Sequence, residues 1–167
     1  MLITVICDVL GRENNGTTIA AMNLIRGLKE RGHSVRVVCP DGEYFSVPGF
    51  YVIPKRNFGP LNGYFEKNGV VLAKPDEYVL RAAINGADAV HIMLPFSVGK
   101  KAVRIAKEAG IPVTAGFHFQ AENLTAHLKL QHFDALNNAV YRSRWKGFYR
   151  YVDCIHYPTA FIKNVFE

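Results

Sequence analysis

The amino-acid sequence predicts an α/β domain with a doubly wound, mainly parallel β-sheet and helices on both faces. Short runs rich in β-branched residues alternate with amphipathic helical segments, and most of those segments end at glycine. The chain of 167 residues is long enough for one domain with a sizeable core. Right-handed crossovers between parallel strands would make the sheet Rossmann-like. Residues 1–167 are expected to form this single domain.

Six segments are expected to be strands, because each is short, apolar and rich in β-branched residues. Residues 2–10 hold the first of them, which has the composition of a buried strand. In chain order, the six segments read LITVICDV, SVRVVCP, FYVIP, DAVHIML, IPVTAGF and DCIHYP.

Helices are expected between the strands. The first covers residues 18–31, ends at Gly32, and has Thr17 or Thr18 to cap its start. Its apolar stripe is expected to contain Ile19, Met22, Ile25 and Leu28. Three more helices are expected in DEYVLRAAING, SVGKKAVRIAKEAG and TAFIKNVFE. Two segments break the alternation: residues 55–74 form a long connection, and residues 121–151 form one long helix or two.

Composition narrows the class of protein. Hydrophobic residues make up 49% of the chain, and no apolar run reaches the roughly 18 residues that a membrane-spanning helix needs. Lys and Arg number 20 against 14 Asp and Glu, which favours an anionic partner such as phosphate, nucleotide sugar, anionic lipid or nucleic acid. Cys7, Cys39 and Cys154 lack metal-ligand spacing, so we expect buried, reduced thiols in an intracellular protein.

The stretch GRENNGTT, between the first strand and the first helix, has the glycine spacing of a phosphate-binding loop. Thr17 stands where a P-loop has its lysine, so P-loop activity is not expected. A dinucleotide fingerprint needs three glycines, and this loop has only Gly11 and Gly16. Asp41 is a poor ribose ligand, because a proline before it has already turned the chain. Two interpretations stay open: an anion site at a helix N-terminus, or a tight turn that needs glycine.

Three segments, taken in order, carry motifs that occur together in one family. They are GRENNGTTIAAMNLIRGLKERGHSVRVVCP, ADAVHIMLPFSVGKKAVRIAKEAGIPVTAGFHFQAEN and YVDCIHYPTAFIKNVFE. The set resembles the N-terminal domain of GT-B glycosyltransferases of family 4, with Thr159 where serine is usual. The resemblance covers nearly the whole chain.

The resemblance implies a retaining transferase that moves a hexose from a nucleotide sugar to a lipid or saccharide acceptor. It implies no essential metal and no cofactor. The N-terminal domain would bind the acceptor, and a C-terminal domain would hold most of the donor and the paired glutamates of an E-x7-E motif. No glutamate pair in this sequence has that spacing and context. The C-terminal domain is therefore expected to lie outside this chain, and the 167 residues alone are expected to be inactive.

The resemblance also assigns site residues. Gly16 matches the family's loop glycine that faces the donor diphosphate, with Asn15 and Thr17 beside it. Asn15 stands where the family usually has a second glycine, and asparagine tolerates the left-handed conformation better than most residues. His118 follows the fifth strand and matches the histidine near the transferred sugar, so it is the expected catalytic residue. The other interpretation of His118 is a cap on the next helix.

Three polar residues follow His118 and are expected to bind the acceptor through its hydroxyl groups. They are Gln120, Glu122 and Asn123. Glu122 is equally well explained as an acid in the first turn of its own helix. His91 lies within the fourth strand and is expected to fill a polar niche near the sheet.

The segment YRSRWKGFYRY is basic and aromatic and contains no acid. One interpretation is an anionic membrane surface contact through Arg142, Arg144, Trp145, Lys146 and Arg150. The other is a core-facing aromatic stripe with a solvated basic edge, formed by Tyr141, Trp145, Phe148 and Tyr149. No nucleic-acid-binding module is recognised.

The sequence therefore predicts the acceptor-side domain of a glycosyltransferase located in the cytoplasm, with peripheral contact at the inner face of the membrane as an open option. Its expected partners are a nucleotide sugar, an acceptor and its own C-terminal domain. The alternative is a non-catalytic Rossmann-like module that binds an anionic small molecule.

Overall fold

The structure is a computed structural model and describes residues 1–8, 10, 16–62, 72–118 and 134–166. Its described part contains a six-stranded sheet in the order β3-β2-β1-β4-β5-β6, and every pairing of neighbouring strands is parallel. The strands are β1 Leu2–Ile6, β2 Ser34–Cys39, β3 Phe50–Val52, β4 Ala89–Ile92, β5 Val113–Gly116 and β6 Cys154–His156. This order confirms the predicted doubly wound, Rossmann-like sheet.

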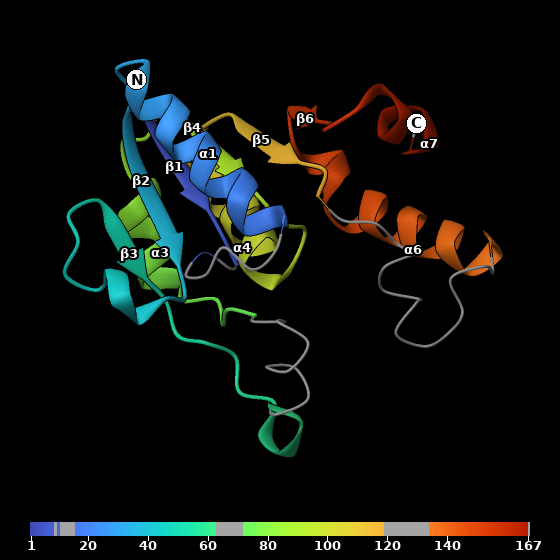
Figure 1. Ribbon diagram of the computed structural model, residues 1–167, viewed down its shortest axis with the longest axis horizontal. Coiled ribbons are helices and arrows are strands. Elements are labelled where there is room, and N and C mark those ends of the chain that lie inside the picture. Colours follow the sequence, from blue (N-terminus) through green and yellow to red (C-terminus); the bar gives the residue numbers. More distant parts are fainter. Residues whose placement is uncertain (9, 11–15, 63–71, 119–133, 167) are drawn as a thin grey trace.

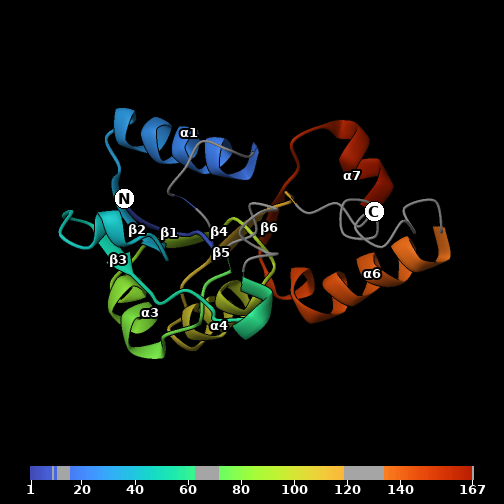
Figure 2. The same cartoon turned by 60° about the horizontal axis from the view of Figure 1, so that its bottom comes forward.

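Helices lie on both faces of the sheet, as predicted. In Figure 2, α1 lies above the sheet, and α3 and α4 lie below it. Figure 1 shows that α6 extends away from the sheet beyond β6. The helices are α1 Gly16–Glu30, α3 Glu77–Ile84, α4 Ser97–Glu108, α6 Asp134–Gly147 and α7 Ala160–Phe166. Short 3₁₀ turns are η1 Gly42–Tyr44, η2 Gly59–Leu61 and η3 Tyr149–Tyr151.

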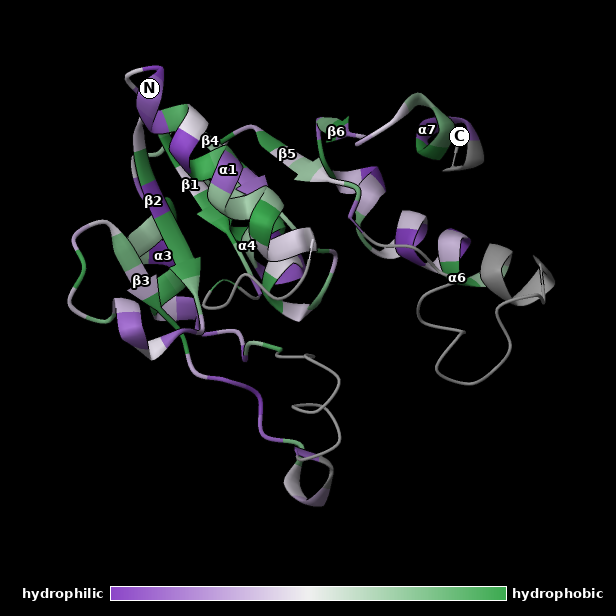
Figure 3. Cartoon of the chain, in the orientation of Figure 1, coloured by the Kyte–Doolittle hydropathy of each residue, from purple (hydrophilic) through white to green (hydrophobic). Residues whose placement is uncertain are grey.

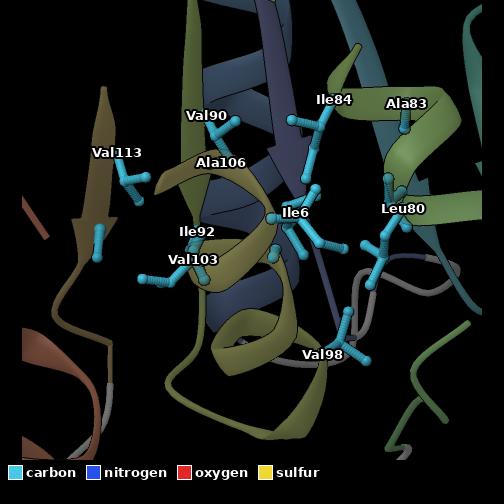
Figure 4. Close-up of a cluster of buried hydrophobic side chains, with 14 of the residues drawn as sticks. Ile6, Leu80, Ala83, Ile84, Val90, Ile92, Val98, Val103, Ala106 and Val113 are labelled. Carbon is cyan, nitrogen blue, oxygen red and sulfur yellow. The ribbon is translucent and has the colours of Figure 1, made fainter. Parts of the chain in front are cut away.

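Side chains alternate across the sheet and build two cores, because successive residues of a strand point to opposite faces. Val5 packs in the cluster beneath α1, and Ile6, the next residue, packs with α3 and α4. Figure 4 shows this second cluster, with Leu80 of α3 and Val103 of α4 directed at the strands. Hydropathy follows the same plan in Figure 3: the strands are largely apolar, and the described part of α6 is mostly polar or neutral.

The ends of α3 and its contact with α4 follow local chemistry. Asp76 caps α3, since its Oδ1 accepts a hydrogen bond of 3.1 Å from the Val79 N–H. Lys101 of α4 and Arg81 of α3 both bind Glu77, and they lower the pKa of this carboxyl group to about 2. Because Glu77 lies at the surface, this network contributes more to the register of α3 against α4 than to stability.

Several sequence-based expectations were wrong in detail. Helix α1 begins at Gly16, so Thr17 and Thr18 lie inside its first turn instead of capping it. Ile19 is 45% exposed and does not belong to the buried face of α1. The buried apolar residues of this helix are Ala21 and Ile25. Cys154 is exposed, because β6 is an edge strand, whereas Cys7 and Cys39 are buried free thiols as expected.

Candidate functional site

The strand order reverses between β1 and β4, and the chains leaving these strands pass to opposite faces of the sheet. In open parallel sheets, ligands bind at the carboxyl ends of the strands near such a reversal. Asp41 helps to form this edge, since its Oδ2 accepts a hydrogen bond of 3.0 Å from the Leu10 N–H. The residue rejected as a ribose ligand therefore holds the chain that leaves β1.

Gly16 opens α1 at this edge. Neither of the usual structural reasons for glycine applies to it in the described structure. Its backbone is not among the glycines with positive φ, and a Cβ atom on Gly16 would meet no described atom within 4 Å. The first turn of α1 contains no acidic residue. The positive end of the helix dipole is therefore not neutralised by a carboxylate of the same helix. None of the described residues fills the space above Gly16.

Asp8 was missed by the sequence analysis. It follows β1, is 1% exposed, and neither carboxylate oxygen has a hydrogen-bond partner within the described structure. Burial raises the pKa of this carboxyl group to about 7, and the nearby Ala73 N–H lowers it to a smaller extent. The signal in the sequence was an acid at the end of a strand that is otherwise apolar.

His118 lies two residues beyond β5 and is half-buried. Its ring lies against Gly116, the last residue of that strand. Burial lowers the pKa of His118, and the neighbouring His156 lowers it further. The lowered pKa favours the neutral imidazole, a form with one hydrogen-bond donor and one acceptor.

Three histidines meet on the α1 side of strands β4 to β6. His91 of β4 pairs in register with Thr114 of β5, and its Nδ1 lies 2.8 Å from the Thr114 Oγ1. His156 of β6 pairs in register with Gly116. Burial, His118 and His156 together lower the pKa of His91 to about 4. The expected polar niche of His91 is confirmed. His156 was missed, because its place beside His118 depends on the pairing of β5 with β6.

Four of the predicted site residues lie outside the described part of the chain: Asn15, Gln120, Glu122 and Asn123. Gly16 and Thr17 lie at the N-terminus of α1, and His118 follows β5.

The basic aromatic segment is divided between core and surface. Phe148 and Tyr149 are buried, and the Tyr149 hydroxyl donates a hydrogen bond of 3.3 Å to the Gly116 carbonyl. Trp145 and Tyr151 are 46% and 48% exposed. Of the basic residues, Arg142, Lys146 and Arg150 are exposed and Arg144 is half-buried. The core-facing interpretation is therefore confirmed for Phe148 and Tyr149 and wrong for Trp145, whereas contact with a membrane surface stays a prediction.

Within the described residues, no group of three or more His, Cys, Asp or Glu side chains is placed to hold a metal ion. No helix in the described ranges is both long enough and apolar enough to cross a bilayer.

The sequence profile of the family described as Glycosyltransferase Family 4 matches residues 14–167. The chain is also similar to an alpha-monoglucosyldiacylglycerol synthase from Acholeplasma laidlawii, with 29% identity over 123 residues. The match covers 68% of this chain and 29% of that protein, so the chain spans only a part of the relative's length. Because the profile covers every described helix and all the strands of the sheet except β1, this chain belongs to glycosyltransferase family 4 and is the N-terminal domain of its GT-B fold.

Proposed function

We propose that this chain is the acceptor-side domain of a retaining glycosyltransferase that transfers a hexose from a nucleotide sugar to a lipid or saccharide acceptor. The family match supports the transferase class. The relative from Acholeplasma laidlawii is named for the synthesis of a glucosylated diacylglycerol, and it favours a lipid acceptor here. A C-terminal domain would complete the cleft and supply the paired glutamates. No cofactor and no essential metal enter the proposal.

The observation that carries the proposal is the position of His118. An imidazole whose pKa is lowered by burial stands at the carboxyl end of β5, within a family whose members transfer sugars. In this role its N–H donates to a hydroxyl of the transferred sugar or of the acceptor. The bond strengthens as charge develops in the transition state, and such a bond accelerates the reaction.

The donor diphosphate is proposed to lie at the N-terminus of α1, over Gly16, with Asn15 and Thr17 beside it. The open space at Gly16 lets a phosphate approach the backbone N–H groups. No lysine is required in this loop, because basic side chains of the C-terminal domain would neutralise the diphosphate. Gln120, Glu122 and Asn123 are proposed to bind the acceptor.

A cytoplasmic location with contact at the inner membrane face is proposed for the same domain. Arg142, Lys146 and Arg150 are exposed beside Trp145. Half-buried Arg144 completes the basic set, and its guanidinium lies 5.8 Å from the centre of the Phe96 ring. Lysine and arginine attract anionic lipid, and exposed indole and phenol rings favour the headgroup region.

The central experiment is the transfer rate of the complete polypeptide with His118→Ala, measured with nucleotide-sugar donors and a diacylglycerol acceptor. Loss of one hydrogen bond to the transition state is expected to lower the rate about a hundredfold, while the melting temperature changes little. His33→Ala, in the turn after α1, is the matched control and is expected to retain the rate. An unchanged rate with a lowered melting temperature would make His118 a helix cap. Saturable anion binding without any transfer would favour the non-catalytic module.

The membrane proposal has its own experiment with the 167-residue chain. Sedimentation with vesicles of anionic phosphatidylglycerol is expected, and vesicles of neutral phosphatidylcholine should leave the chain in solution. The pair Arg142→Glu and Lys146→Glu should abolish sedimentation. The control pair, Arg26→Glu on α1 and Arg31→Glu in the turn after it, changes the charge by the same amount and should not. Equal loss in both pairs would mean that only net charge matters.

A further inference from the structure

Gly116 stands under the ring of His118. A Cβ atom at position 116 would lie 2.6 Å from both Cδ2 and Nε2 of that ring. The same Cβ would lie 3.7 Å from Nε2 of His91, which is an ordinary contact. Carbon atoms of packed side chains approach to about 3.5–4.0 Å, so the His118 ring occupies the volume that any other residue at 116 would fill.

The backbone does not need glycine at this position. The described glycines with positive φ are Gly32, Gly49, Gly59, Gly86 and Gly110, and Gly116 is not one of them. Gly116 is the last residue of β5, where glycine weakens a strand because it loses more conformational freedom than other residues. The benefit of glycine at 116 must therefore come from the space above its Cα.

The floor of this space is held from both sides. The Tyr149 hydroxyl donates a hydrogen bond of 3.3 Å to the Gly116 carbonyl, and the Phe117 N–H donates one of 2.9 Å to the His156 carbonyl. His91 forms the wall on the β4 side, and its ring is tied to Thr114. The floor and one wall of the space that the His118 ring occupies are thus each held by hydrogen bonds.

We propose that Gly116 is a positioning residue: its missing side chain forms a seat, walled by His91, that fixes the orientation of the His118 imidazole. The inference rests on the proposed function, since it deepens the role given there to His118. The seat decides which ring nitrogen faces the substrate. Misplacement of a reacting group by about 1 Å costs up to a hundredfold in rate, so a small rotation of the ring is enough to matter.

An alanine at 116 should displace the ring at little cost in stability. The atoms in the way belong to the end of a side chain that can rotate, not to the backbone. Alanine also suits a strand better than glycine does. Gly116→Ala is thus expected to keep the melting temperature while it moves His118. Gly42→Ala is the matched control, because a Cβ at Gly42 would meet no described atom within 4 Å and its φ is not positive.

The first arm of the test uses the 167-residue chain and does not depend on activity. NMR titration of the histidine ring protons reports the pKa of His118. In Gly116→Ala the ring leaves its half-buried seat, so the His118 pKa should rise toward its ordinary value, with no change in Gly42→Ala. Two titratable groups face this ring from the strands on either side of β5: His91 on β4 and His156 on β6. An identical His118 titration in Gly116→Ala would overturn the proposal.

The second arm uses the complete polypeptide. Gly116→Ala should lower kcat at least tenfold, and Gly42→Ala should not. In a double-mutant cycle, Gly116→Ala should have no further effect once His118 is alanine, because it acts only through that ring. Additive losses, or a displaced ring with normal kcat, would overturn the proposal. If no variant transfers sugar, the proposed function fails, while the NMR arm still decides whether the seat exists.

Discussion

Nδ1 of His91 lies 2.8 Å from Oγ1 of Thr114, so a side-chain hydrogen bond links β4 to β5 at a pair of residues that face each other in register. The link lies at the wall of the site that holds His118. Burial is the main reason that the pKa of His91 falls to about 4, and the ring is therefore neutral when folded at ordinary pH.

The His91 pKa predicts a loss of stability in mild acid. The unfolded chain takes up a proton at this residue near pH 6.5, and the folded chain does so only near pH 4. Between these values the unfolded state binds more protons, so stability falls as the pH falls. The contribution of His91 is about 3 kcal/mol over this window. Urea unfolding from pH 7.5 to 4 should show the native chain losing about this much stability relative to His91→Gln, because groups common to both chains, such as Asp8 and His118, cancel in that difference. Parallel curves for the two chains would contradict it.

Asp8 should act in the opposite direction. Its pKa is 3.8 when unfolded and about 7 when folded, so the folded state holds a proton that the unfolded state releases as the pH rises. Asp8→Asn removes this cost. The variant should gain stability over the native chain progressively from about pH 4 to 7, by roughly 4 kcal/mol at the top of the range. Glu43→Gln, at an exposed position, controls for the loss of one negative charge. A gap that does not vary with pH would refute the prediction.

Gly99, the third residue of α4, should not tolerate alanine. A Cβ there would lie 2.5 Å from the Leu94 carbonyl oxygen and 2.8 Å from Cγ2 of Ile92. One of these is a backbone atom that cannot rotate away, so Gly99→Ala should cost about 1–3 kcal/mol. Gly27→Ala, in α1, is the matched helical control, since its Cβ meets only the mobile end of Arg31. It should raise stability by up to about 1 kcal/mol. Thermal unfolding of the two variants checks both signs.

Gly16→Ala should separate ligand binding from folding. The substitution fills open space in the first turn of α1, so the melting temperature should stay the same or rise slightly. If a phosphate lies against this backbone, the methyl group should raise the KM for the donor in the complete polypeptide about tenfold. An unchanged KM would show that the diphosphate lies elsewhere. A lowered melting temperature would instead favour the interpretation of Gly16 as a turn residue.

The sequence by itself determined the elements that depend on neighbouring residues. All six predicted strands are present, and so are the four helices whose segments were predicted. The signals that predict them, which are β-branched runs, apolar stripes and terminal glycines, each depend on only a few neighbouring residues. Gly32 ends α1 with a φ of 78°, as its place after an amphipathic run predicts. The motif order was also sufficient to identify the family, which the profile match confirms.

Only the tertiary structure decided which of these residues meet. His91, Gly116 and His156 come together through the registers of β4, β5 and β6, and register is a property of strand pairs that no single segment encodes. Burial is likewise decided by what packs above a residue: Asp8 is enclosed and Ile19 is exposed, although the local pattern suggested a buried Ile19. The seat at Gly116 exists because the His118 ring lies back over the end of β5. Which atoms lie above a given Cα is a property of the folded chain and not of the local sequence.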